Sequence, residues 1–66
     1  MSSLGEDYPK QQAMCRRILE SYIEIGPAGA FAAGMIRAVL KEADEAAVSG
    51  DLVRMIRAYQ AMKDVQ

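Results

Sequence analysis

The side chains of this chain that could do chemistry are one cysteine and a set of scattered carboxylates. The 66 residues include one Cys, nine Asp or Glu and no His. A nucleophilic cysteine usually needs a neighbouring base, and acid–base catalysis needs carboxylates or a histidine held in a water-poor cleft. Cys15 falls on the apolar side of a predicted helix, and Glu42 and Glu45 fall on a polar face. We therefore expect no enzymatic activity, with Cys15 as a core residue.

Metal and cofactor sites are not expected either. A structural zinc site needs about four Cys or His ligands, and the chain offers one. Gly26-Pro27-Ala28-Gly29 precedes a predicted helix, but no strand leads into it and no Lys-Ser or Lys-Thr follows, so it is not a phosphate loop. A helix N-terminus can still hold an anion. A ligand-sequestering helical oligomer that uses residues 27–30 therefore stays open as an alternative.

Two arginines raise the alternative of DNA binding. Arg54 and Arg57 would point outward from the second helix of a hairpin that partly fits helix-turn-helix spacing. Affinity for DNA depends largely on contacts with phosphates, and three acids between residues 42 and 45 lie close to where those phosphates would be. A small DNA-binding regulator is therefore the second hypothesis, and nucleic acid is not the favoured partner.

Composition favours helices and a protein inside the cell. The apolar fraction is 52%, of which little is aromatic, and the net charge is −1. The N-terminal residues have no charged region followed by an apolar core, so they do not resemble a signal peptide. No continuous apolar run reaches about 18 residues, so we expect no membrane partner. The cytoplasm is the expected location.

Glycine, proline and capping residues divide the chain into three predicted helices. Asp7 can cap the first helix, and Gly26-Pro27 ends it. Gly50 fits the position after a second helix, and Asp51 can cap a third. The predicted elements are a disordered tail at 1–7 and a single helical domain at 8–66, with helices at about 8–25, 27–48 and 51–64.

The predicted fold is all-α, with the second and third helices as an antiparallel hairpin. A chain of this length is near the lower limit for burying its own core, and small scaffolds usually need a disulfide, a metal or a partner subunit. A lone Cys15 cannot form an internal disulfide. We therefore expect homodimerisation to complete the fold.

Small residues and methionines mark the expected interface. Gly29/Ala33 and Ala30/Gly34 are spaced so that two helices can approach closely. The same pairs could equally pack inside the chain against the first helix, and the sequence leaves both interpretations open. Methionine and large aromatic side chains are favoured at binding surfaces. The candidate interface residues are Gly29, Ala30, Phe31, Ala33, Gly34, Met35, Tyr22, Tyr59 and Met62.

Four stretches of the chain resemble a group of short proteins encoded by Mu-like transposable phages and prophages of proteobacteria. They are Glu24 to Phe31, Met35-Ile36, Ser49 to Val53, and Ile56 to Tyr59. The resemblance covers about residues 7–64 and brings no activity that could be assigned to a residue. It implies a phage accessory protein made in a bacterial host cell, where such proteins often bind and modulate a host protein, or assist phage assembly or regulation.

The sequence thus favours a small, non-enzymatic protein–protein interaction module. It is expected to be a homodimer that binds another macromolecule, with a host protein as the expected target, through an apolar face rich in Met and Ala.

Overall fold

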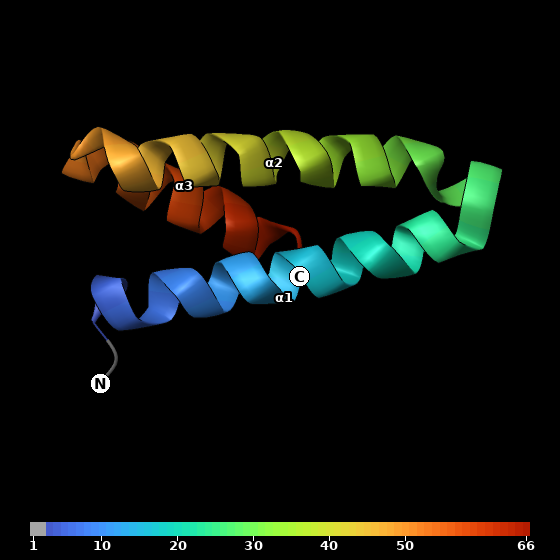
Figure 1. The fold of residues 1–66 in the computed structure, drawn as a ribbon, viewed down its shortest axis with the longest axis horizontal. Helices are drawn as coiled ribbons and strands as arrows, with labels where there is room; N and C mark the ends of the chain where they lie inside the picture. The colour runs from blue at the N-terminus through green and yellow to red at the C-terminus, as the bar shows by residue number, and fades with distance from the viewer. Residues whose placement is uncertain (1–2) are drawn as a thin grey trace.

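The computed structural model describes residues 3–66, which are almost entirely helical (Figure 1). Helix α1 spans Leu4–Ile25, the 3-10 helix η1 spans Gly26–Gly29, α2 spans Ala30–Ser49 and α3 spans Leu52–Asp64. The all-helical prediction is confirmed. The prediction of three separate helices is wrong, because α1, η1 and α2 follow one another without a non-helical residue. The described chain therefore consists of one long, folded-back helical run and one short helix.

Helix α1 begins earlier than predicted. Ser3, not Asp7, is the N-cap, and its hydroxyl accepts a hydrogen bond from the Glu6 amide at 3.2 Å. Leu4 is half-buried and packs against the core. This tertiary contact supports helical geometry on the N-terminal side of Pro9. The predicted tail at 1–7 is therefore wrong for residues 3–7, and residues 1–2 lie outside the described part of the chain.

The chain reverses direction at Gly26-Pro27, where α1 is followed directly by η1 (Figure 1). Gly26 has φ 84° and ψ −142°, a region that favours glycine, and its amide donates to the Ile23 carbonyl. Pro27 then occupies the first turn of η1, where its missing N–H costs nothing. The predicted end of the first helix at Gly26-Pro27 is therefore a tight turn that passes directly into η1.

The second turn follows the sequence prediction closely. Gly50 is left-handed, with φ 76° and ψ 3°. Asp51 caps α3, and its carboxylate accepts from the Arg54 amide at 3.1 Å. Helix α3 then runs back along α2 and lies between α1 and α2 (Figure 1).

The core contains many small side chains, which lets α1, α2 and α3 approach one another closely. Two buried groups bond to backbone carbonyls: the Tyr8 hydroxyl donates to Ala43 at 2.7 Å, and the Cys15 thiol donates to Met62 at 3.4 Å. The buried apolar residues are Tyr8, Cys15, Ala33, Ile36, Leu40, Ala43, Ala46, Ala58 and Met62.

Helix α3 is too short to cover the whole α1–α2 hairpin. At 1.5 Å per residue its 13 residues extend about 20 Å, whereas the 22 residues of α1 and 20 of α2 extend about 30 Å. The C-terminus therefore lies beside the middle of α1, and the half of the hairpin nearest η1 has no third helix on it (Figure 1).

The described residues contain one helical run, Leu4–Ser49, that is long and apolar enough to cross a membrane by length and composition. Its apolar window covers 18 residues with at most two charges. Given the charges at Glu20, Glu24, Arg37 and Lys41, any such window includes residues 26–29, where the chain reverses. The window is therefore the end of a helical hairpin and not a straight span.

Candidate protein-binding face

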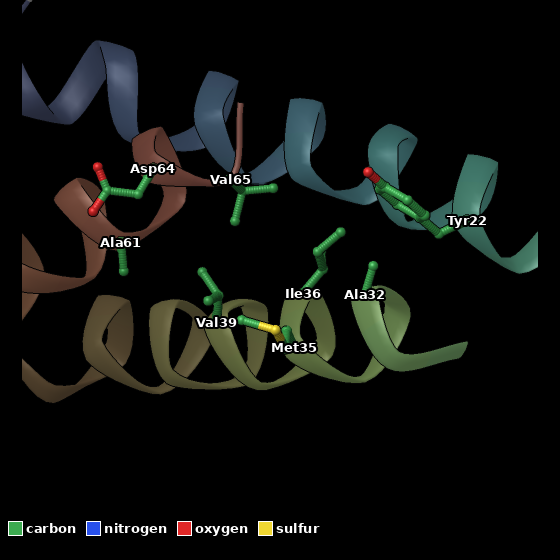
Figure 2. Close-up of a pocket in the computed structure, with 8 residues that line it drawn as sticks. All are labelled: Tyr22, Ala32, Met35, Ile36, Val39, Ala61, Asp64 and Val65. Atoms are coloured by element: carbon green, nitrogen blue, oxygen red, sulfur yellow. The ribbon is translucent and has the colours of Figure 1, made fainter. Parts of the chain in front are cut away.

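An apolar groove opens where α3 ends. It has a volume of about 380 Å³ and is lined by α1, α2 and the last turn of α3. Figure 2 shows Tyr22 on one wall, Met35, Val39 and Ala32 on the other, and Val65 between Tyr22 and Asp64. Phe31 is exposed and lies one helical turn before Met35, so it is Met35's neighbour on the surface of α2. We call the apolar lining and Phe31 the open face; its residues are Tyr22, Phe31, Ala32, Met35, Val39 and Val65.

The open face continues the surface of α2 that carries α3. Residues 32, 35, 36 and 39 recur at helical spacing, and the same face further along α2 contains Ala43 and Ala46, which are buried under α3. In the first half Ile36 is buried in the core and Ala32 and Val39 are half-buried, whereas Met35 is exposed. The apolar face of α2 is therefore only partly covered where α3 does not reach it.

Large apolar side chains on the open face are strongly exposed. Phe31 is 81% exposed, Met35 is 58% exposed and Tyr22 is 36% exposed. The sequence from Ile25 to Ile36 contains no charged residue, and Asp64 is the charged side chain at the edge of the groove. Clustered apolar exposure of this kind usually marks a binding site, whereas scattered exposed apolar residues need no explanation.

Part of the predicted interface lies inside the molecule. Gly29 and Ala33 are buried between α2 and α1. A Cβ on Gly29 would overlap the Tyr22 carbonyl oxygen and lie 3.1 Å from the carbonyl carbon. This small-residue pair therefore packs inside the chain, and both residues are removed from the candidate interface.

The other small-residue pair points outward. Ala30 and Gly34 are exposed, and a Cβ on Gly34 would meet no atom within 4 Å. Both residues are therefore at the surface, and their place in an interface stays a prediction.

The two candidates from α3 do not belong to the open face. Met62 is 0% exposed, so its assignment to an interface is wrong. Tyr59 is half-buried; its hydroxyl donates to the Asp7 carboxylate, and the Lys63 ammonium lies 5.6 Å from its ring centroid. The Tyr59 side chain therefore links α3 to the start of α1. The sequence analysis treated Asp7 as a helix cap and so did not predict this contact.

The arginines proposed for DNA binding differ in their surroundings. Arg54 forms a two-pronged ion pair with Glu42, at 2.7 and 2.8 Å, and reaches Glu45 at 3.4 Å. Hydrogen bonding to Arg54 lowers the pKa of Glu42, and the same bond raises the pKa of Arg54. Arg57 is exposed. Because Arg54 is paired with two carboxylates, its positive charge is largely neutralised and attracts the phosphates of DNA only weakly.

The anion and metal alternatives gain no support from the geometry. The Ala30 amide donates to the Pro27 carbonyl, so it is used within the turn. Among residues 3–66, no three acidic or cysteine side chains gather closely enough to hold a metal ion. Cys15 is buried, and burial raises the pKa of its thiol, which disfavours the reactive thiolate.

Tyr8 gives a prediction for the pH dependence of stability. Burial, and then the charges of Asp44 and Glu42, raise the pKa of the Tyr8 phenol. A group that binds its proton more tightly when folded contributes full stability below its unfolded pKa, about 10 for tyrosine, and loses it as pH rises through the folded pKa. We expect the free energy of unfolding to fall above about pH 10, and the Tyr8→Phe variant to show a smaller fall.

Urea unfolding followed by circular dichroism, at about pH 8 and about pH 11, on either side of the tyrosine pKa, checks this expectation. At neutral pH the variant should be about 1 kcal/mol less stable, because the bond to the Ala43 carbonyl is lost. The alkaline loss should shrink but not vanish, since the pKa values of Cys15 and Tyr59 are raised as well. An equal alkaline loss in both proteins would contradict the role given to Tyr8.

Comparisons with protein-family models, with curated proteins and with solved structures find no match to this chain. The class of protein defined here is therefore structural: a helical hairpin with a short third helix and an apolar face left open beyond it.

Proposed function

We propose that this chain is a small, non-enzymatic protein–protein interaction module that binds through its open face. The observation that carries the proposal is that α3 covers only half of the α1–α2 hairpin and leaves Phe31 and Met35 exposed beside an apolar groove. Apolar grooves between helices commonly receive the apolar side of another helix, through anchors spaced three and four residues apart.

The favoured partner class is therefore a protein that presents an amphipathic helix. The resemblance to Mu-like phage proteins supplies a setting for this proposal: an accessory protein in the cytoplasm of a bacterium, with a host protein as its target. Aromatic and methionine anchors such as Phe31 and Met35 are suited to this role, because large side chains that become fully desolvated contribute most to binding.

A capture experiment with two matched variants tests the proposed function. Immobilised wild-type protein, Phe31→Glu and Val48→Glu are exposed to a lysate of the host cell, and retained proteins are compared. Val48 is the control because it is apolar, lies on the same helix and is 87% exposed, yet it is outside the open face. We expect a partner retained by wild type and Val48→Glu and lost from Phe31→Glu.

Circular dichroism should show that both variants keep their helices, because both positions are exposed. A partner that Phe31→Glu retains as well as wild type does would contradict the assignment of the open face. DNA binding is not advanced as a second function, because Arg54 is paired with Glu42 and Glu45.

A further inference from the structure

We infer that in the isolated protein the open face is occupied by a second copy of this chain, in a two-fold symmetric pairing of the hairpin ends. The inference rests on the proposed function, because it assigns one specific occupant, a second copy of the chain, to the same binding face. It is carried by three properties of that face: its shape, its charge and its area.

The shape of the open face is suited to meeting its own copy. A two-fold interface places one surface patch against the identical patch, so the patch must hold both a projection and a recess. Phe31 is the projection, at 81% exposure. The groove of about 380 Å³ is the recess, and Met35, which lines it, lies one helical turn after Phe31 on the same side of α2. Phe31 of each copy can therefore enter the groove of the other.

The charge of the open face also suits a second copy. Near a two-fold axis each residue faces itself or a close neighbour, so any charge there meets a like charge and is repelled. The stretch Ile25 to Ile36 carries no charge, and the residues that bound it, Glu24 and Arg37, have opposite signs. Self-pairing through this stretch therefore opposes no like charges at its centre, and Asp64, the charged residue at the edge of the groove, lies outside this stretch on α3.

The exposed area approaches what a stable dimer needs. Phe31 is 81% exposed, and Met35 is 58% exposed. With Tyr22, these side chains leave uncovered on the order of half of the roughly 800 Å² that each partner buries in a standard interface. Ala32 and Val39 of the same face are half-buried and can supply more. A chain this short has much to gain from that burial.

Sedimentation equilibrium of the purified full chain tests the second copy. The proteins are wild type, Phe31→Glu, Met35→Glu and the control Val48→Glu, over a micromolar to millimolar range. We expect wild type and Val48→Glu to approach twice the 7.2 kDa monomer mass, and the two open-face variants to stay at 7.2 kDa. Circular dichroism of all four should show the same helix content, since all three positions are exposed.

Three results would overturn the inference. Wild type could remain at 7.2 kDa at every concentration, the open-face variants could dimerise like wild type, or Val48→Glu could lose the dimer equally. If wild type is monomeric but binds phosphatidylcholine vesicles in a Phe31-dependent way, the occupant is a lipid surface and not a second copy.

The outcome is separable from that of the proposed function. A monomeric wild type that still captures a partner through Phe31 removes the second copy and leaves the interaction module. If the protein forms a Phe31-dependent dimer but captures no other protein, the second copy is supported and the proposed partner protein is contradicted.

Discussion

Replacing Gly29 by alanine is expected to destabilise the protein by about 2 to 3 kcal/mol, although alanine normally favours a helix. Gly29 is buried where η1 meets α1, and a Cβ there would overlap the carbonyl oxygen of Tyr22. That oxygen belongs to the backbone of α1 and cannot move aside as a flexible side chain would. The two helices must therefore separate, which opens the buried contacts between them.

Gly34→Ala is the matched control for this substitution. Gly34 lies further along, within α2, is exposed, and a Cβ added there would have no atom within 4 Å. The substitution is expected to stabilise the protein by about 1 kcal/mol, through helix propensity alone. Urea unfolding of both variants at the same low protein concentration measures the two effects. Equal changes would show that α1 and α2 do not approach as closely as the structure indicates.

Replacing Met62 by alanine is expected to cost about 2 to 5 kcal/mol, because it removes a fully buried side chain and leaves a cavity. Met62 is 0% exposed and lies in the core cluster between α3 and the hairpin. A core of this size supplies only about 3 to 5 kcal/mol in total. The variant should therefore be largely unfolded or only marginally folded at room temperature, as thermal unfolding followed by circular dichroism would show.

Met35→Ala provides the comparison within the same residue type. Met35 is 58% exposed, so its truncation should change the stability of the monomer by less than about 0.5 kcal/mol. If Met35→Ala were as damaging as Met62→Ala, the open face would have to be buried within the monomer, and the proposed binding surface would not exist.

The positions of the turns could be predicted from the sequence because they depend on local chemistry. Gly50 adopts a left-handed conformation and Asp51 caps α3, and both follow from conformational preference and from one side-chain hydrogen bond. The start of α1 could not be predicted in this way. Helix geometry at Leu4 is supported by packing against the core and by the bond between Asp7 and Tyr59, which is 52 residues away.

Which apolar side of α2 faces inward could not be predicted from periodicity either. Phe31 and Met35 fit a helical stripe, so periodicity alone places them in the core, yet the residues that are buried include Ala33, Ala43 and Ala46. Close approach of the helices selects the small side chains, because large ones would hold the helices apart. The uncharged stretch from Ile25 to Ile36 is the sequence signal for the open face, and its meaning depends on the length of α3.

The most direct test of a second copy on the open face is an amide-resolved NMR dilution series of the wild-type chain. Lowering the concentration should shift the amide resonances of Tyr22, Phe31, Met35 and Val39 as the second copy leaves. Resonances around Val48, at the other end of α2, should stay fixed. Spectra that do not change with concentration, or changes centred on Val48, would contradict a second copy on the open face.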